Sequence, residues 1–389
     1  MKPAKRILPL IVFSQFCCTS IWFASNAVMG SLLESFDLSS TALGHLTSAV
    51  QLGFIFGTLI FALLSVADRF SPSRVFLFCA VLGGLFNLGL VWPGNTLVSL
   101  IVMRFLAGLC LAGIYPVGMK IAADYYEHGL GKSLGFLVGA LVLGTAFPHF
   151  LQAFIGDLSW VYVIIFISAL AVLGGFLIGQ FVPDGPYRKA AAGLDLSAIF
   201  KVFRIREFST AAIGYFGHMW ELYAFWAFVP FILVSYGAFH PHVHLDISLW
   251  SFLIIGMGSL GCILAGYLYI NQGAKKIASM ALAISGLCCL VSPLIFLQPS
   301  PVLLIIFLLI WGLAVVADSP LFSTMVAQNA PADFKGTALT IVNSLGFALT
   351  IFSIQLLNYF RASVDVHYLF IVLAVGPAVG LSFLWKGKS

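Results

Sequence analysis

The sequence predicts an all-α polytopic membrane protein with twelve transmembrane helices in two pseudo-symmetric six-helix bundles. Two observations carry most of this prediction. Only 8% of the 389 residues are charged and 61% are hydrophobic, whereas about 25% of the residues in a soluble domain are charged. So few charges cannot cover a water-facing surface, and lipid is therefore the expected solvent. The second observation is a series of apolar runs of membrane-spanning length.

Polar residues, glycine and proline mark the ends of these runs. A membrane-spanning helix needs about 20 apolar residues, and the chain offers such runs at 7–30, 41–66, 74–93, 97–122, 131–156, 160–182, 207–236, 247–270, 275–297, 301–327, 335–359 and 366–385. We interpret the first run as an uncleaved membrane helix, because it lacks a convincing small-residue cleavage site. The longest polar break predicts an N-terminal bundle (1–182), a cytoplasmic linker (183–206) and a C-terminal bundle (207–389).

The lysines and arginines predict the orientation. With the N-terminus inside, sixteen of them fall in inside segments and only Arg361 falls in an outside loop. Basic residues prefer cytoplasmic loops, so both termini are expected in the cytoplasm and the chain in the inner membrane. These loop cations also explain the pI near 8.8, and no nucleic-acid partner is expected.

An internal echo supports two matching halves. The run GLCLAGIYP (108–116) in the fourth span matches GLAVVADSP (312–320) in the tenth. Gly-Leu opens both runs, and proline follows the glycine by eight residues. A parallel repeat of six-helix units predicts a substrate cavity between the halves, near the middle of the membrane.

At this point the chain resembles the major facilitator superfamily, over its whole length. The inside loop LSVADRFSPSRV (64–75) is similar to the family's G-x-x-x-D-R/K-x-G-x-R-K/R motif. The matching residues are Asp68, Arg69 and Arg74, and the departures are Leu64, Ser71 and Ser73. The resemblance implies the family's fold, and it implies that the three matching residues act in gating.

The fourth span also resembles the family, with Arg104 followed by Gly108 four residues later. This pattern looks most like branches that carry small organic anions. The nitrate branch places an arginine in each of spans two and eight, where this chain offers only Gln51, so nitrate is disfavoured. The exporter motif of span five has a Gly-Pro pair, and here Ala140 follows Gly139.

Arg104 is the first candidate for substrate binding. Charges inside a membrane are costly, by about 2.5–3.5 kcal/mol at a helix centre, and a guanidinium suits the oxygen pair of a carboxylate. On an unbroken helix Tyr115 shares the face of Arg104. The alternative is a structural arginine bound to helix carbonyls or to an acid. Lys120, about 24 Å further along the axis, is better explained by snorkelling or a pair with Asp124.

Three residues are candidates for proton coupling. Glu221 is the only acid in GHMWELYAFWAF (217–228), and His218 precedes it by three residues. Apolar surroundings disfavour the charged form of a carboxyl group, which can then bind a proton, and a histidine can relay it. Asp318 takes the repeat position of Ile114. The alternatives are a static Arg104–Glu221 pair and a structural role for Asp318.

Other polar or aromatic side chains are expected to line the cavity. They are Asn26, Gln51, His149, Trp220 and Tyr223. Each alone is equally compatible with hydrogen bonding between helices.

The sequence therefore predicts a secondary active transporter that moves a small organic anion by alternating access, with proton symport. The first alternative is a proton-driven exporter of amphipathic compounds, and the second is a membrane sensor. No catalytic cluster indicates an enzyme, and HGLGKS (128–133) lacks the first glycine of a phosphate-binding loop. We expect a monomer that contacts lipid, substrate and protons, without cofactor or metal. The histidines of HPHVHLD (240–246) are a weak metal signal.

Overall fold

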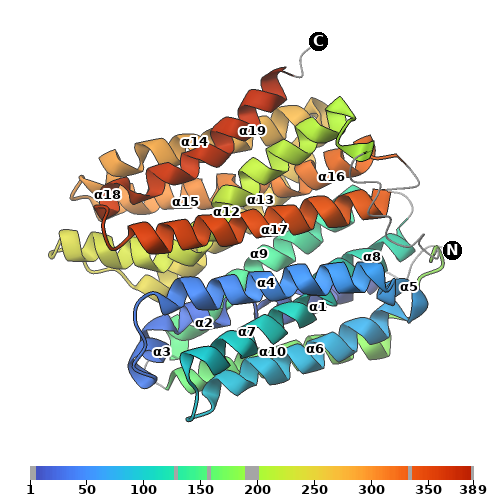
Figure 1. Ribbon diagram of the computed structural model, residues 1–389, viewed down its shortest axis with the longest axis horizontal. Helices are drawn as coiled ribbons and strands as arrows, with labels where there is room; N and C mark the ends of the chain where they lie inside the picture. The colour runs from blue at the N-terminus through green and yellow to red at the C-terminus, as the bar shows by residue number, and fades with distance from the viewer. Residues whose placement is uncertain (1–5, 127–129, 156–158, 189–200, 332–334, 387–389) are drawn as a thin grey trace. The chain divides into compact units, whose positions relative to one another are not determined.

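The computed structural model describes residues 6–126, 130–155, 159–188, 201–331 and 335–386. The elements in these ranges are helices, and they form two compact units, Met1–Leu194 (unit 1) and Asp195–Ser389 (unit 2). Eleven continuous or broken helices of the described ranges are long and apolar enough to cross a membrane. The predicted all-α, multi-pass membrane fold is confirmed (Figure 1). Of the predicted linker 183–206, residues 189–200 lie outside the described ranges.

Unit 1 holds the first six predicted spans. Its helices are α1 (Ile7–Thr19), α2 (Ala24–Ala27), α3 (Met29–Ser35), α4 (Ala42–Leu63), α5 (Val66–Arg69), α6 (Pro72–Leu88), η1 (Gly89–Val91), α7 (Leu97–Ala112), α8 (Tyr115–Tyr125), α9 (Leu130–Ile155) and α10 (Trp160–Phe181). α1 packs against α9 and α10, and α4 lies along α7 (Figure 1).

The first predicted span, 7–30, is broken into α1, α2 and α3 instead of forming one helix. Two hydroxyl groups at the end of α1 explain the first break. Thr19 Oγ1 donates to the carbonyl oxygen of Gln15 at 2.8 Å, and Ser20 Oγ donates to that of Cys17 at 2.6 Å. Such bonds from serine and threonine compete with the helical ladder and bend helices. The chain leaves the helix at residues 20–23, inside the unit.

Unit 2 holds the last six predicted spans. Its helices are α12 (Arg206–Phe239), α13 (Ile247–Gln272), α14 (Ala274–Phe296), α15 (Pro301–Ala317), α16 (Ser319–Asn329), α17 (Lys335–Phe360), α18 (Val366–Leu369), η3 (Phe370–Ala374) and α19 (Val375–Lys386). The 34-residue α12 packs against α13, α15, α16, α17 and α19. Polar side chains on α12 are therefore enclosed by other helices.

The fourth and tenth predicted spans break at equivalent places in the two units. α7 gives way to α8 at Gly113–Ile114, and α15 gives way to α16 at Asp318. Pro116 and Pro320 stand in the first turns of α8 and α16, where proline needs no hydrogen-bond partner for its nitrogen. The prolines of the sequence echo thus mark helix starts.

Close contacts between helix backbones occur at equivalent positions within each of the two units. A Cβ on Gly108 of α7 would lie 2.1 Å from the carbonyl oxygen of Val50 on α4. A Cβ on Gly312 of α15 would lie 2.0 Å from the carbonyl oxygen of Ile254 on α13. Both residues of the second pair stand 204 positions after those of the first.

A second pair of glycines repeats the same register. A Cβ on Gly57 of α4 would lie 2.7 Å from the carbonyl oxygen of Leu109, and one on Gly261 of α13 would lie 2.2 Å from that of Leu313. The shift is again 204 positions. We call α4–α7 and α13–α15 the glycine-packed pairs. Their shared register shows that the echo read from the sequence extends to the packing of the helices.

Candidate functional site

Glu221 lies on α12 inside unit 2, and its side chain is fully buried. Three side chains donate hydrogen bonds to its carboxyl group. Trp311 Nε1 donates to Oε1 at 2.6 Å, and Cys289 Sγ donates to the same oxygen at 3.4 Å. Ser285 Oγ donates to Oε2 at 2.9 Å. A buried carboxyl group with donors on both oxygens is compatible with the ionised form.

His218 and Asp318 form a second buried acid–base contact in unit 2. His218 Nδ1 lies 2.7 Å from Asp318 Oδ1, and both side chains are at most 1% exposed. Asp318 stands at the break between α15 and α16, and His218 lies on α12, three residues before Glu221. The structure therefore places all three predicted proton-coupling residues in one unit, two of them in direct contact.

Arg104 lies on α7 inside unit 1 and is fully buried. Its Nη1 donates to the carbonyl oxygen of Ile21 at 3.0 Å, and its Nη2 donates to that of Trp22. Both carbonyl groups belong to the break between α1 and α2. Among the described residues no acidic side chain forms an ion pair with Arg104. Arg104 thus binds the backbone of the break, and no carboxylate of the described ranges pairs with its charge.

Three more predicted substrate-binding residues are buried in unit 1. Asn26 Nδ2 donates to Thr47 Oγ1 at 2.9 Å, and Gln51 Oε1 accepts a bond from Trp22 Nε1 at 3.2 Å. Asn26 Oδ1, Gln51 Nε2 and His149 Nε2 have no hydrogen-bond partner among the described residues. Buried polar atoms normally have a partner, so these three atoms can take one from a ligand.

The predicted aromatic residues are dispersed. Tyr115 begins α8, beyond the break at Gly113–Ile114, so the helical face expected from Arg104 to Tyr115 is interrupted. Trp220 on α12 donates from Nε1 to the carbonyl oxygen of Val372 at 3.1 Å. The buried ring of Tyr223 packs against those of Trp226 and Phe347, each at a centroid distance of 5.2 Å.

Four further buried residues with polar atoms were not among the site residues predicted from the sequence: Gln15 in unit 1 and Ser285, Cys289 and Trp311 in unit 2. The amide of Gln15 has no partner among the described residues, and its Oε1 lies 2.3 Å from where Gly118 would carry a Cβ. Ser285 and Cys289 stand four residues apart, on one face of α14. Trp311 directly precedes the echo glycine Gly312, so inspection of residues flanking the echo would have found it.

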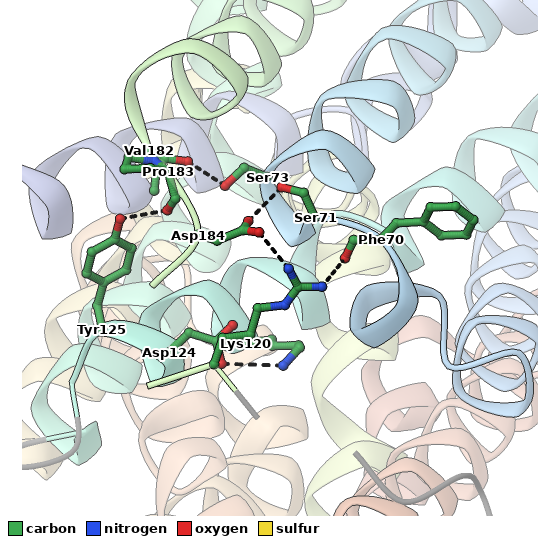
Figure 2. A network of polar contacts seen from close by, with 10 residues as sticks. Phe70, Ser71, Ser73, Lys120, Asp124, Tyr125, Val182, Pro183 and Asp184 are labelled. Carbon is green, nitrogen blue, oxygen red and sulfur yellow. Dashed lines mark hydrogen bonds and ion pairs between the residues drawn. The ribbon is translucent and has the colours of Figure 1, made fainter. Parts of the chain in front are cut away.

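A network of hydrogen bonds connects the loop between α5 and α6, and the first turn of α6, to residues 182–188 (Figure 2). Ser71 Oγ donates to Asp184 Oδ1 at 2.6 Å, and Ser73 Oγ donates to the carbonyl oxygen of Val182 at 2.6 Å. Arg188 forms a 2.6 Å ion pair with Asp184 and donates to the carbonyl oxygen of Phe70 at 2.8 Å. We call this set the loop clasp. Two departures from the family motif, Ser71 and Ser73, donate two of its hydrogen bonds.

The end of α8 joins the same segment. Tyr125 Oη donates to the carbonyl oxygen of Pro183 at 2.6 Å, and the amide of Tyr187 donates to that of Asp124 at 3.0 Å. Lys120 Nζ lies 3.3 Å from Asp124 Oδ1, which confirms the predicted pair at i,i+4. Arg69 and Arg74 are exposed. The side chain of Asp68 lies outside the described part of the chain.

Replacing Asp184 with alanine should loosen residues 182–188. The change removes the acceptor of Ser71 and the partner of Arg188, although an exposed ion pair contributes only about 0–1 kcal/mol. We expect faster amide hydrogen exchange in this segment, with the melting temperature almost unchanged. Glu34→Ala, which removes an exposed acid of the same unit, is the control. Equal exchange in both variants would contradict the clasp.

His240 of the predicted histidine loop and Arg361 have local partners in unit 2. His240 Nε2 lies 2.9 Å from the carbonyl oxygen of Phe296, and the described residues contain no group of three histidine, cysteine or acidic side chains placed to hold a metal. Arg361 lies over the ring of Phe231, 5.5 Å from its centroid, and partial burial lowers its pKa. The backbone amide and ring of His367 hold the pKa of Asp365 below its usual value.

Two curated relatives match part of the chain. The niacin transporter NiaP of Acinetobacter baylyi is 28% identical over 166 residues, which are 39% of this chain and 37% of the relative. The 4-hydroxybenzoate transporter PcaK of Pseudomonas aeruginosa is 28% identical over 151 residues, 36% of this chain and 32% of the relative. The chain thus spans about a third of the length of these relatives.

Solved structures share the fold across nearly the whole chain. The proton:xylose symporter XylE matches with a TM-score of 0.75 at 15% identity, covering 98% of this chain and 95% of that one. The nucleoside transporter NupG matches with a TM-score of 0.74 at 15% identity, covering 99% and 100%. The family model described as "Major Facilitator Superfamily" matches residues 11–354 of the chain. The chain, with its two helical units in repeated register, belongs to the major facilitator superfamily.

Proposed function

We propose that the chain is a secondary active transporter that carries a small organic anion into the cell together with protons. The superfamily and the solved neighbours are transporters, which are not enzymes. Transport would proceed by alternating access, in which two six-helix repeats expose the substrate to one side of the membrane and then the other.

The anionic substrate is supported by the charge buried in unit 1. Niacin and 4-hydroxybenzoate, the compounds named for the two relatives, are small aromatic carboxylates. Arg104 brings a buried positive charge with no acidic partner among the described residues, and a charge in such surroundings attracts an anion strongly. Gln51 Nε2 and His149 Nε2 are buried nitrogens that can donate hydrogen bonds to its oxygens, and Asn26 Oδ1 can accept one from a donor group of the substrate.

The observation that carries proton coupling is the set of buried acids in unit 2. Glu221 and Asp318 are fully buried, and His218 contacts Asp318 at 2.7 Å. Burial of a carboxyl group disfavours its charged form, so such groups bind and release protons as their access to water changes. Ionisable residues inside a membrane commonly serve proton relays. We therefore assign Glu221 the coupling proton, with His218 and Asp318 as its relay.

Orientation and gating complete the proposal. The excess of basic residues in one set of loops supports an inner-membrane protein with both termini in the cytoplasm. Asp68, Arg69 and Arg74 would then lie on the cytoplasmic side and act in gating. We propose that the chain works as a monomer.

Glu221→Gln should abolish proton-driven accumulation of an aromatic carboxylate such as niacin in proteoliposomes. The amide keeps the shape of the side chain but cannot ionise, so uptake should fall to the level reached without a pH gradient. Exchange of labelled for unlabelled substrate should persist, because it needs no net proton movement. The matched control is Glu34→Gln, on an exposed acid of unit 1.

The same vesicles separate the rival functions. Accumulation that collapses with an uncoupler supports symport. Full gradient-driven accumulation by Glu221→Gln would overturn the coupling role of Glu221. Gradient-driven efflux of lipophilic cations, without uptake of carboxylates, would identify an exporter instead.

A further inference from the structure

The three donors around Glu221 differ in what they can do. The indole N–H of Trp311 can only donate a hydrogen bond, whereas the hydroxyl group of Ser285 can donate or accept. The thiol of Cys289 is a weak donor at 3.4 Å. Trp311 and Cys289 both face Oε1, and Ser285 alone among these three faces Oε2. The two oxygens of the carboxyl group are therefore not equivalent.

Protonation changes what each oxygen requires. An ionised carboxyl group only accepts hydrogen bonds, but a neutral one also donates from its O–H and needs an acceptor. A proton on Oε1 would face the N–H of Trp311, which has no lone pair to offer, and the sulfur of Cys289, which is only a weak acceptor. A proton on Oε2 faces Ser285 Oγ, which has lone pairs. Ser285 Oγ also lies 3.2 Å from the carbonyl oxygen of Leu282, a second acceptor for its hydrogen.

We propose that Glu221 binds its coupling proton on Oε2, and that the hydroxyl group of Ser285 then turns from donor to acceptor. In this step a hydronium ion transfers one proton to Oε2 and becomes water. The hydrogen of Ser285 rotates from Oε2 to the carbonyl oxygen of Leu282, and no other covalent bond forms or breaks. Trp311 keeps its bond to Oε1 in both states. This inference rests on the proposed role of Glu221 in proton coupling.

Trp311 and Ser285 thereby take different positioning roles. Trp311 binds the ionised form more strongly than the neutral form, because a hydrogen bond to a charged group is the stronger one. Ser285 serves both forms. The other titratable groups that interact with this site in the described chain are the thiols of Cys288 and Cys289 on α14, the thiol of Cys262 on α13 and the His218–Asp318 pair.

Infrared titration of the purified full chain tests the proposal without transport. The carbonyl stretching band of protonated Glu221 is identified as the band lost in Glu221→Gln. Trp311→Phe should move the midpoint of its titration to higher pH, by about one unit, since the ionised form loses its stronger bond. Ser285→Ala should move the band of the neutral acid to higher frequency, because its O–H then lacks an acceptor.

Two further variants complete the test. Ser285→Thr retains the hydroxyl group and should keep the wild-type frequency. Ser292→Ala is the matched control: it removes a buried serine of α14 that donates to the carbonyl oxygen of Cys289 at 2.8 Å, and it should change neither band nor midpoint. If Ser285→Ala does not fold, Trp311→Phe and Ser285→Thr still decide.

An unmoved band in Ser285→Ala, or a midpoint in Trp311→Phe that stays or falls, would overturn the inference. Its failure is distinguishable from failure of the proposed function. If proton-driven uptake needs Glu221 but the infrared band does not respond to changes at Ser285 or Trp311, only the proposed change of Ser285 from donor to acceptor is wrong. If the band responds as expected but the chain shows no proton-driven uptake, only the proposed proton-coupled transport is wrong.

Discussion

Replacing Gly108 with alanine is expected to destabilise the folded chain by about 1–3 kcal/mol. The added Cβ would lie 2.1 Å from the carbonyl oxygen of Val50, and backbone cannot rotate away as a side chain can. α4 and α7 would have to separate along their contact. Gly312→Ala should cost a similar amount, because its Cβ would lie 2.0 Å from the carbonyl oxygen of Ile254.

Thermal unfolding in detergent measures both effects. The control is Gly266→Ala on α13, where an added Cβ meets nothing within 4 Å. In a helix alanine is intrinsically favoured over glycine, so this control should be neutral or stabilising. Equal melting temperatures for Gly108→Ala and Gly266→Ala would show that the glycine-packed pair tolerates a side chain.

Replacing Arg104 with methionine should impair both folding and anion uptake. The change removes the two hydrogen bonds from the charged guanidinium to the carbonyl oxygens of Ile21 and Trp22, at about 1.5–3 kcal/mol each. Relief from burying a charge offsets part of this loss, so we expect a net destabilisation of about 2 kcal/mol. The apparent KM for an anionic substrate should rise at least about tenfold, which corresponds to about 1.4 kcal/mol of lost attraction.

Lysine at position 104 separates the two effects. Arg104→Lys keeps the charge but loses the planar fork that reaches two carbonyl groups. The apparent KM should therefore rise less than in Arg104→Met, whereas the melting temperature should still fall. Lys120→Met, at the other end of the same predicted span, should alter stability by less than about 1 kcal/mol. If Arg104→Met melted like the wild type while its KM rose, direct substrate contact, not support of the break, would be the main role of Arg104.

Local features could be predicted from the sequence, because their causes lie within a few residues. Each run of about 20 apolar residues forms one helix or two to three consecutive helices, and the Lys120–Asp124 pair follows from helical spacing alone. The break at residues 20–23 depends on whether two hydroxyl groups turn toward their own helix. Apolarity and length do not report that choice, so the first span was expected to be continuous.

Residues that form long-range contacts could be predicted individually, but their partners could not. His218 and Asp318 were both candidates, yet their contact joins residues a hundred positions apart. Arg104 was identified as a buried charge, but its acceptors exist only because another helix is broken. Likewise, the sequence showed Ser71 and Ser73 only as departures from the family motif. Their bonds to Asp184 and Val182 show that the chain uses those positions for a different contact.

The glycine-packed pairs also have a mechanical consequence. Helices that touch through backbone have no flexible side chains between them to absorb sliding, so we expect α4 and α7 to move as one rigid body, and α13 and α15 likewise. We then expect bending in either unit to occur at the helix breaks next to these rigid pairs. Those breaks lie at Gly113–Ile114 and at Asp318, where the chain lacks continuous helical hydrogen bonding.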